Sequence, residues 1–158
     1  MIYQSTHKPN TIEFVKMVPE AVIPKVSRAG DIGYDVCSSE NVVLPAGKTT
    51  KVSSGIQLAW QPKTLDNMRF FMKVEGRSGL SVKGVFPVGG IIDPTYRGEI
   101  GIVLANMSGK DYKIAQGDRI AQLVVYVVNT SFSLNMVEVD AITPNDERGE
   151  QGFGSSGV

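Results

Sequence analysis

The stretch GGIIDPTYRGEI, residues 89–100, predicts a tight turn between two β-strands. Apolar β-forming runs at 91–92 and 100–104 flank the tetrad Asp93-Pro94-Thr95-Tyr96. Aspartate followed by proline favours a type I turn, which holds its first and fourth residues within about 7 Å. The glycines of this stretch leave bare backbone that a ligand can approach. The hairpin is therefore a candidate small-molecule site that carries Asp93 and Tyr96, and an ordinary solvated turn is the alternative.

The rest of the chain has the pattern of an all-β protein. We expect further strands at residues 12–18, 41–45, 49–60, 68–75, 85–88, 101–107, 112–115, 120–128 and 132–139. Short strands separated by frequent turn signals, without a convincing helical stretch, are typical of a β-sandwich or β-barrel. We expect one all-β core over residues 1–140 and a flexible C-terminal arm over residues 141–158.

The amino-acid composition argues against several kinds of binding partner and of metal or disulfide chemistry. The 158 residues carry 16 basic and 16 acidic side chains, which argues against broad binding to nucleic acid or to an anionic membrane. Cys37 is the single cysteine and His7 the single histidine, so neither a disulfide nor a Cys/His zinc set is expected. No apolar run approaches the roughly 18 residues of a membrane span. We expect an intracellular protein, cytoplasmic or nuclear.

Arg77-Ser78-Gly79 is a candidate phosphate-binding element. It combines a bidentate cation, a hydroxyl donor and a bare backbone amide. It lacks the ending of a P-loop, and no obvious helix follows it. A plain turn at the end of a strand is the alternative.

Gln122 is a candidate site residue on the strand expected at residues 120–128. Strand alternation predicts Ala121 and Leu123 on one face and Ile120 and Gln122 on the other. Gln122 shares its face with the apolar Val124, so it is expected to be half-buried and to need a hydrogen-bond partner. A glutamine at the edge of the core, satisfied by backbone, is the alternative.

The tail at residues 148–157 carries Arg148, Phe153, Ser155 and Ser156 among four glycines. This composition does not bury enough apolar surface to fold alone. An aromatic ring, an arginine and two hydroxyls are nevertheless the groups needed to cover a nucleobase and hold phosphates. A disordered C-terminus without a function is the alternative.

Taken together, these elements resemble the trimeric all-β dUTP pyrophosphatases, the dUTPase family. Five ordered motifs carry the resemblance, at residues 32–36, 76–81, 90–98, 117–123 and 148–157. Ile32 replaces the usual alanine of the first motif, and Gln151 replaces a common glycine of the fifth.

The resemblance implies a jelly-roll-like subunit of the β-clip type that forms a homotrimer with its sites at subunit interfaces. It implies hydrolysis of dUTP to dUMP and pyrophosphate by attack of water on the α-phosphate, with Mg²⁺ held by the triphosphate. This reaction keeps uracil out of DNA and supplies dUMP for thymidylate synthesis.

The resemblance also implies roles for single residues. Asp93 would orient and deprotonate the water, and Tyr96 would lie beneath the deoxyribose and exclude a ribose 2′-hydroxyl. The hairpin backbone, including Gly90 and Ile92, would read the uracil edge. Asp35 would act indirectly, through water around the metal or by bracing the arginines.

The remaining implied roles concern the phosphates and the closing tail. Arg77, Ser78 and Gly79 would bind the phosphates, with Gln122 near the α-phosphate and Arg148 on the γ-phosphate. Phe153 would stack over uracil as the tail closes. Gly154, Ser155 and Ser156 would add further contacts from the tail.

The sequence bears on three rival functions. A dCTP deaminase of similar fold would carry a catalytic glutamate on the return strand, but residues 101–106 contain no acid. A non-enzymatic binding module would give no reason for Asp93, Gln122 and Arg148 to occur together. A regulatory role beside dUTP hydrolysis stays open.

Overall fold

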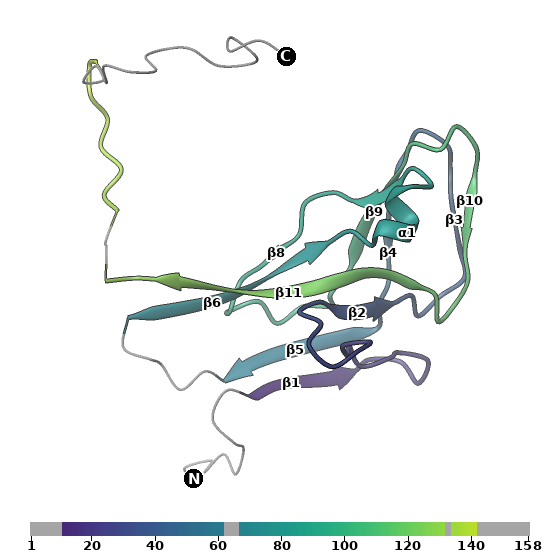
Figure 1. Ribbon diagram of the computed structural model, residues 1–158, viewed down its shortest axis with the longest axis horizontal. Helices are drawn as coiled ribbons and strands as arrows, with labels where there is room; N and C mark the ends of the chain where they lie inside the picture. Colours follow the sequence, from purple (N-terminus) through teal and green to yellow (C-terminus); the bar gives the residue numbers. More distant parts are fainter. Residues whose placement is uncertain (1–10, 62–66, 132–133, 142–158) are drawn as a thin grey trace.

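A computed structural model describes residues 11–61, 67–131 and 134–141, and within these residues the chain is almost entirely β, as predicted. Its centre is a four-stranded antiparallel sheet in the order β2-β11-β6-β8. These strands are β2 (Tyr34–Cys37), β11 (Arg119–Asn129), β6 (Met68–Glu75) and β8 (Ile91–Ile92). In Figure 1 the long pair of β6 and β11 crosses the middle of the molecule.

Three smaller antiparallel groups of strands surround this sheet (Figure 1). The three-stranded sheet has the order β4-β9-β7, with β4 (Thr49–Val52), β9 (Ile102–Asn106) and β7 (Val85–Pro87). The two-stranded pairs are β1 (Thr11–Lys16) with β5 (Ile56–Gln61), and β3 (Val42–Leu44) with β10 (Tyr112–Ile114).

One buried apolar cluster joins these sheets into a sandwich-like body. Every sheet contributes at least one fully buried side chain to this cluster. Examples are Leu123 of β11, Leu104 of β9, Leu44 of β3 and Ile56 of β5. Burial of an aliphatic side chain of this size contributes about 1.5–3 kcal/mol. The hydrophobic effect thus holds together strands that backbone hydrogen bonds alone leave in separate sheets.

The start of β11 differs from simple strand alternation. The pairing of β11 with β2 shifts register between Arg119 and Ala121. A bulge of this kind inserts one residue into a strand, so the side chains on either side no longer alternate. Ile120 and Ala121 are therefore both fully buried, and the predicted placement of Ile120 on the face of Gln122 is wrong.

Two other strand predictions were also wrong. The run expected at residues 49–60 is divided by a bend at residues 53–55, where Gly55 has a φ of +65°. The last strand, expected at residues 132–139, is not formed over 134–139; residues 132–133 lie outside the described part. Residues 134–141 lead away from the sheets in Figure 1, and Met136 is 99% exposed. A strand needs a neighbouring backbone, and this segment has none beside it within the described chain.

Among the described residues there is one helix, the single turn α1 (Ser78–Ser81), at the position where no helix was expected. Its first turn closes because the amides of Leu80 and Ser81 both donate to the Arg77 carbonyl, each at 2.9 Å. One turn is too short to produce a helical hydrophobic period in the sequence.

Asn106 at the end of β9 is a buried polar side chain with every hydrogen-bonding group satisfied. It is 0% exposed, and its amide donates to the carbonyls of Leu44 (2.7 Å) and Lys110 (2.8 Å). Its Oδ1 accepts from the Ser108 amide at 3.0 Å and from the Ser108 hydroxyl at 2.7 Å. Asn106 therefore fixes the β9–β10 turn against β3.

We predict that Asn106→Ala lowers the free energy of unfolding by about 2–4 kcal/mol, because the buried Leu44 carbonyl and the partly buried Lys110 carbonyl lose their donor. Ser108→Ala, which removes a donor from a less buried position, should cost only about 1 kcal/mol. Chemical denaturation of both variants measures the difference. Equal losses would show that the Asn106 network is not the stronger constraint.

Candidate active site

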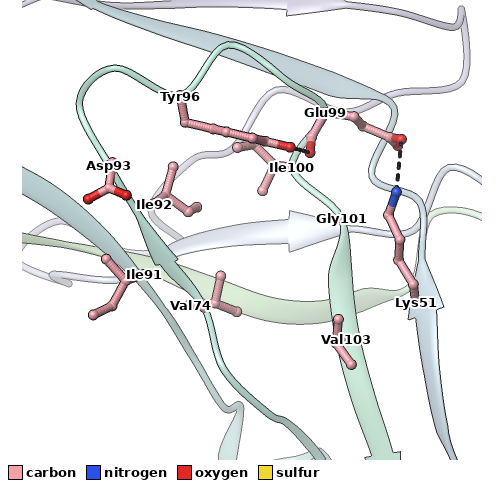
Figure 2. A pocket seen from close by; sticks show the side chains of 11 residues that line it. Lys51, Val74, Ile91, Ile92, Asp93, Tyr96, Glu99, Ile100, Gly101 and Val103 are labelled. Atoms are coloured by element: carbon pink, nitrogen blue, oxygen red, sulfur yellow. Dashed lines mark hydrogen bonds and ion pairs between the residues drawn. The ribbon is translucent and has the colours of Figure 1, made fainter.

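The hairpin expected at residues 89–100 forms a hydrogen-bonded turn. The Tyr96 amide donates to the Asp93 carbonyl at 3.0 Å, which confirms the predicted turn. Both side chains line a hollow of about 250 Å³, together with Glu99 and Lys51. Figure 2 shows the Tyr96 ring reaching toward Glu99, with the Asp93 carboxylate at the other end of the hollow.

Two glycines bring backbone close to side chains in this hairpin. Gly90 has a φ of +120°, and a Cβ added to it would lie 2.7 Å from the Cβ of Val74. A Cβ on Gly98 would collide with the Tyr96 hydroxyl. Glycine is therefore required at both positions for the observed packing. Ile92 is buried beside them and pairs with Met72 of β6, so its side chain is not exposed to a ligand.

A second hollow, of about 1000 Å³, lies at the start of β11. Asp35 is its electrostatic centre, with a side chain only 14% exposed. The Arg77 Nε donates to one carboxylate oxygen at 2.9 Å, while Arg119 Nη1 (3.1 Å) and the Ser27 hydroxyl (2.5 Å) donate to the other. Burial raises the pKa of Asp35, but the Ser27 and Arg119 hydrogen bonds and the two positive charges outweigh it, and the pKa lies below its ordinary value.

The two arginines are thus held side by side by one carboxylate. Arg77 also donates to the Arg119 carbonyl at 3.2 Å, and Arg119 donates to the Ser27 hydroxyl at 3.0 Å. Adjacent guanidinium groups repel each other, so the shared Asp35 anion is needed to keep both in place. Their outward donors are suited to a polyanion such as a triphosphate.

Ser78 and Gly79 follow Arg77 at the start of α1 and line the same hollow, exposed. A Cβ added to Gly79 would meet no atom within 4 Å. Packing within the chain therefore does not require glycine there, and the bare backbone faces open space.

Gln122 is half-buried on β11, as expected, and its hydrogen-bond partner is backbone, which is what the alternative to a site role describes. Its Nε2 donates to the Gly76 carbonyl at 2.9 Å. The side chain passes directly over Gly33, where any Cβ would collide with its Oε1. Gly33 and Gly76 therefore set the position of Gln122 at the edge of the second hollow.

The expected site residues divide between the two hollows. Asp93, Tyr96, Gly90 and Ile92 line the first, whereas Arg77, Ser78, Gly79, Gln122 and Asp35 line the second, and the two hollows share no lining residue. Arg148, Phe153, Gly154, Ser155 and Ser156 of the expected arm lie outside the described residues.

Sequence reasoning did not single out three residues that lie in these hollows, namely Ser27, Glu99 and Arg119. Arg119 lies in the fourth motif, directly after a turn aspartate, and that position was a usable signal. Glu99 gave no signal, because its partner Ser53 lies 46 residues away in the sequence. Ser27 also gave no signal, because it lies outside the five motifs.

Neither a metal cage nor a membrane-spanning helix is seen in the described residues. No group of three or more His, Cys, Asp or Glu side chains there is arranged to hold a metal ion. The single helix found over 11–61, 67–131 and 134–141 is not long and apolar enough to cross a bilayer.

Comparison with known proteins identifies the family to which this fold and this sequence belong. The family model for dUTPase matches residues 19–157. The deoxyuridine 5′-triphosphate nucleotidohydrolase of Crocosphaera subtropica is 37% identical over 93% of this chain and 99% of its own. The mitochondrial enzyme of that name from Dictyostelium discoideum is 36% identical over 99% of this chain and 83% of its own.

A solved structure agrees with this result. The G164S mutant of the dUTPase of Staphylococcus bacteriophage 80alpha, solved with dUpNHpp, has a TM-score of 0.77 at 26% identity, over 94% of this chain and 99% of its own. The chain belongs to the dUTPase family. It is a hydrolase that converts dUTP to dUMP and pyrophosphate.

The lowered pKa of Asp35 gives a prediction about stability. Folding favours the ionised carboxylate, so its contribution is complete above the unfolded pKa of about 4 and disappears as the pH falls through the lower folded value. Asp35→Asn should lower the free energy of unfolding at pH 7 by about 1–3 kcal/mol, and the difference from the parent should shrink below about pH 4. Denaturation at several pH values measures this, and a difference that does not change with pH would contradict it.

Proposed function

We propose that dUTP is hydrolysed where the first hollow of one subunit meets the second hollow of its neighbour in a homotrimer. The division of the site residues between two hollows supports this proposal. Asp93 in the first hollow can act only if a triphosphate lies beside it. Arg77 and Arg119 in the second hollow can bind that triphosphate, but their hollow lacks the hairpin that would recognise the base. Neighbouring copies would supply each hollow with what it lacks.

Asp93 is proposed as the general base. Its carboxylate is exposed, and no side-chain hydrogen bond or ion pair engages it within the described part of the chain. Its oxygens are therefore available to orient a water molecule and accept its proton as that water attacks the α-phosphate. No covalent nucleophile is needed for hydrolysis of a phosphoanhydride.

The second hollow is proposed to hold the triphosphate. Arg77 and Arg119, braced by Asp35, neutralise charge in the ground state and in the transition state. The Ser78 hydroxyl and the Gly79 amide add donors, and Gln122 lies near the α-phosphate. Arg148 of the C-terminal arm (residues 141–158, beside a core of 1–140) is proposed to reach the γ-phosphate.

The hairpin is proposed to select the base and the sugar. Backbone groups at Gly90 and Ile92 read the uracil edge, and Tyr96 fills the space that a ribose 2′-hydroxyl would need. Phe153 stacks over uracil as the arm closes, and Gly154, Ser155 and Ser156 add contacts.

Mg²⁺ is the proposed cofactor, held by the triphosphate and not by a protein cage. Mg²⁺ keeps several waters and prefers one or two carboxylates with substrate phosphates. The donor set fits this arrangement, because Asp35 already accepts three hydrogen bonds and retains capacity mainly for a metal-bound water. When bound, the ion would supply charge neutralisation on the phosphates.

In the cell we propose an intracellular enzyme, cytoplasmic or nuclear, that keeps uracil out of DNA and supplies dUMP for thymidylate synthesis. Nucleic acid and membrane are not proposed as partners, because the formal net charge is zero.

We predict that Asp93→Asn lowers kcat on dUTP by about 10²–10⁴-fold with little change in nucleotide affinity, since only the base is removed. A pyrophosphate-release assay with dUTP, dCTP, dTTP and UTP measures turnover and selectivity together. Asp111→Asn, at an exposed turn, is the matched control and should keep parental turnover. Parental turnover of Asp93→Asn would remove Asp93 from its proposed role.

A further inference from the structure

Glu99 lies in the hollow with Asp93 and Tyr96 and has no place in the mechanism above. Its side chain is only 22% exposed. A half-buried carboxylate in the same hollow as the proposed general base adds unfavourable negative charge, unless it has a positional role. Its contacts point to such a role.

The Glu99 carboxylate binds the bend between β4 and β5. One oxygen accepts from the Ser53 hydroxyl and from the Gly55 amide, the latter at 3.0 Å. The other forms an ion pair with the Lys51 ammonium at 3.9 Å. A dashed line marks this ion pair in Figure 2. Burial raises the pKa of Glu99, but the Ser53 and Gly55 hydrogen bonds and Lys51 together bring the pKa below its ordinary value. The charged carboxylate thus ties the hairpin to a bend that lies 44 to 46 residues away in the sequence.

The backbone of the same residue holds the Tyr96 ring. The Tyr96 hydroxyl donates to the Glu99 carbonyl at 3.0 Å (Figure 2). The ring lies against Gly98, where any side chain would collide with it. The next residue is also fixed, because the Ile100 amide donates to the Ile56 carbonyl at 2.9 Å. Tyr96 therefore takes its position from a backbone segment that the Glu99 side chain ties to the bend.

We propose that Glu99 is a positioning residue for sugar discrimination: by anchoring residues 96–99 to the β4–β5 bend, it fixes the Tyr96 ring where it excludes a 2′-hydroxyl. This inference rests on the proposed role of Tyr96. A ring with freedom to move accommodates an additional hydroxyl, so loss of the anchor relaxes selectivity before it stops hydrolysis.

The test compares kcat/KM on dUTP and UTP for the parent and a set of variants. Glu99→Ala should lower the dUTP/UTP ratio on the order of 10-fold, mainly through faster use of UTP. Glu99→Gln should restore most of the ratio, because its amide oxygen still accepts from Ser53 and Gly55. If Glu99→Ala does not fold, Ser53→Ala removes a donor of the same anchor and should lower the ratio in the same direction.

Glu40→Ala is the matched control. Its Oε1 accepts from the Ser53 amide at 2.7 Å, so Glu40 braces the same bend without touching the hairpin. Glu40→Ala should lose stability and keep the parental ratio. An equal fall of the ratio in Glu40→Ala and Glu99→Ala would overturn the proposal, because general loosening of the bend would then explain both.

Tyr96→Ala separates failure of this inference from failure of the proposed function. A lowered ratio in Tyr96→Ala with a parental ratio in Glu99→Ala and Ser53→Ala would overturn the role of Glu99 and leave the sugar filter intact. A parental ratio in Tyr96→Ala would overturn the filter itself, and the role of Glu99 with it.

Discussion

The pairing of β11 with two neighbours is the constraint on which the second hollow, the one around Asp35, depends. Gln122 lies opposite Glu75 of β6 on one side and opposite Asp35 of β2 on the other. This register places the end of β6, and with it Arg77, beside the Asp35 carboxylate. A one-residue slip of β11 would move Gln122 to the opposite face and separate these groups. Because Leu123 is fully buried next to Gln122, such a slip would also expose core surface.

The hairpin with Asp93 depends on a different contact. Residues 91–92 pair with β6, whereas residues 99–100 are held against the start of β5, at Ile56 and Gln57. The turn is therefore fixed at its two ends by two different sheets, and both sheets pack on the same core. This arrangement gives rigid support to residues that are themselves exposed, as the proposed role of Asp93 requires.

Local features of the fold could be predicted from the sequence, and distant ones could not. The Asp93-Pro94 turn and the partner of Gln122 follow from residue types and strand periodicity, and both were found. The contact of Glu99 with Ser53 joins residues 46 apart, and that of Arg119 with Ser27 joins residues 92 apart. Neither contact leaves a local pattern. The segment 134–139 has strand-like residues but no neighbouring strand in the described chain, so composition alone misled the prediction.

The central claim, that each site joins the Asp93 hollow of one copy to the Arg77 hollow of another, can be measured with mixed oligomers. Asp93→Asn and Arg77→Ala, each nearly inactive alone, are co-refolded in equal amounts and assayed for pyrophosphate release from dUTP. If the site is shared between copies, random mixing leaves about a quarter of the sites with both native groups, and about that share of parental activity should return. A mixture no more active than the sum of the two variants would show that both groups act within one chain, which would contradict the claim.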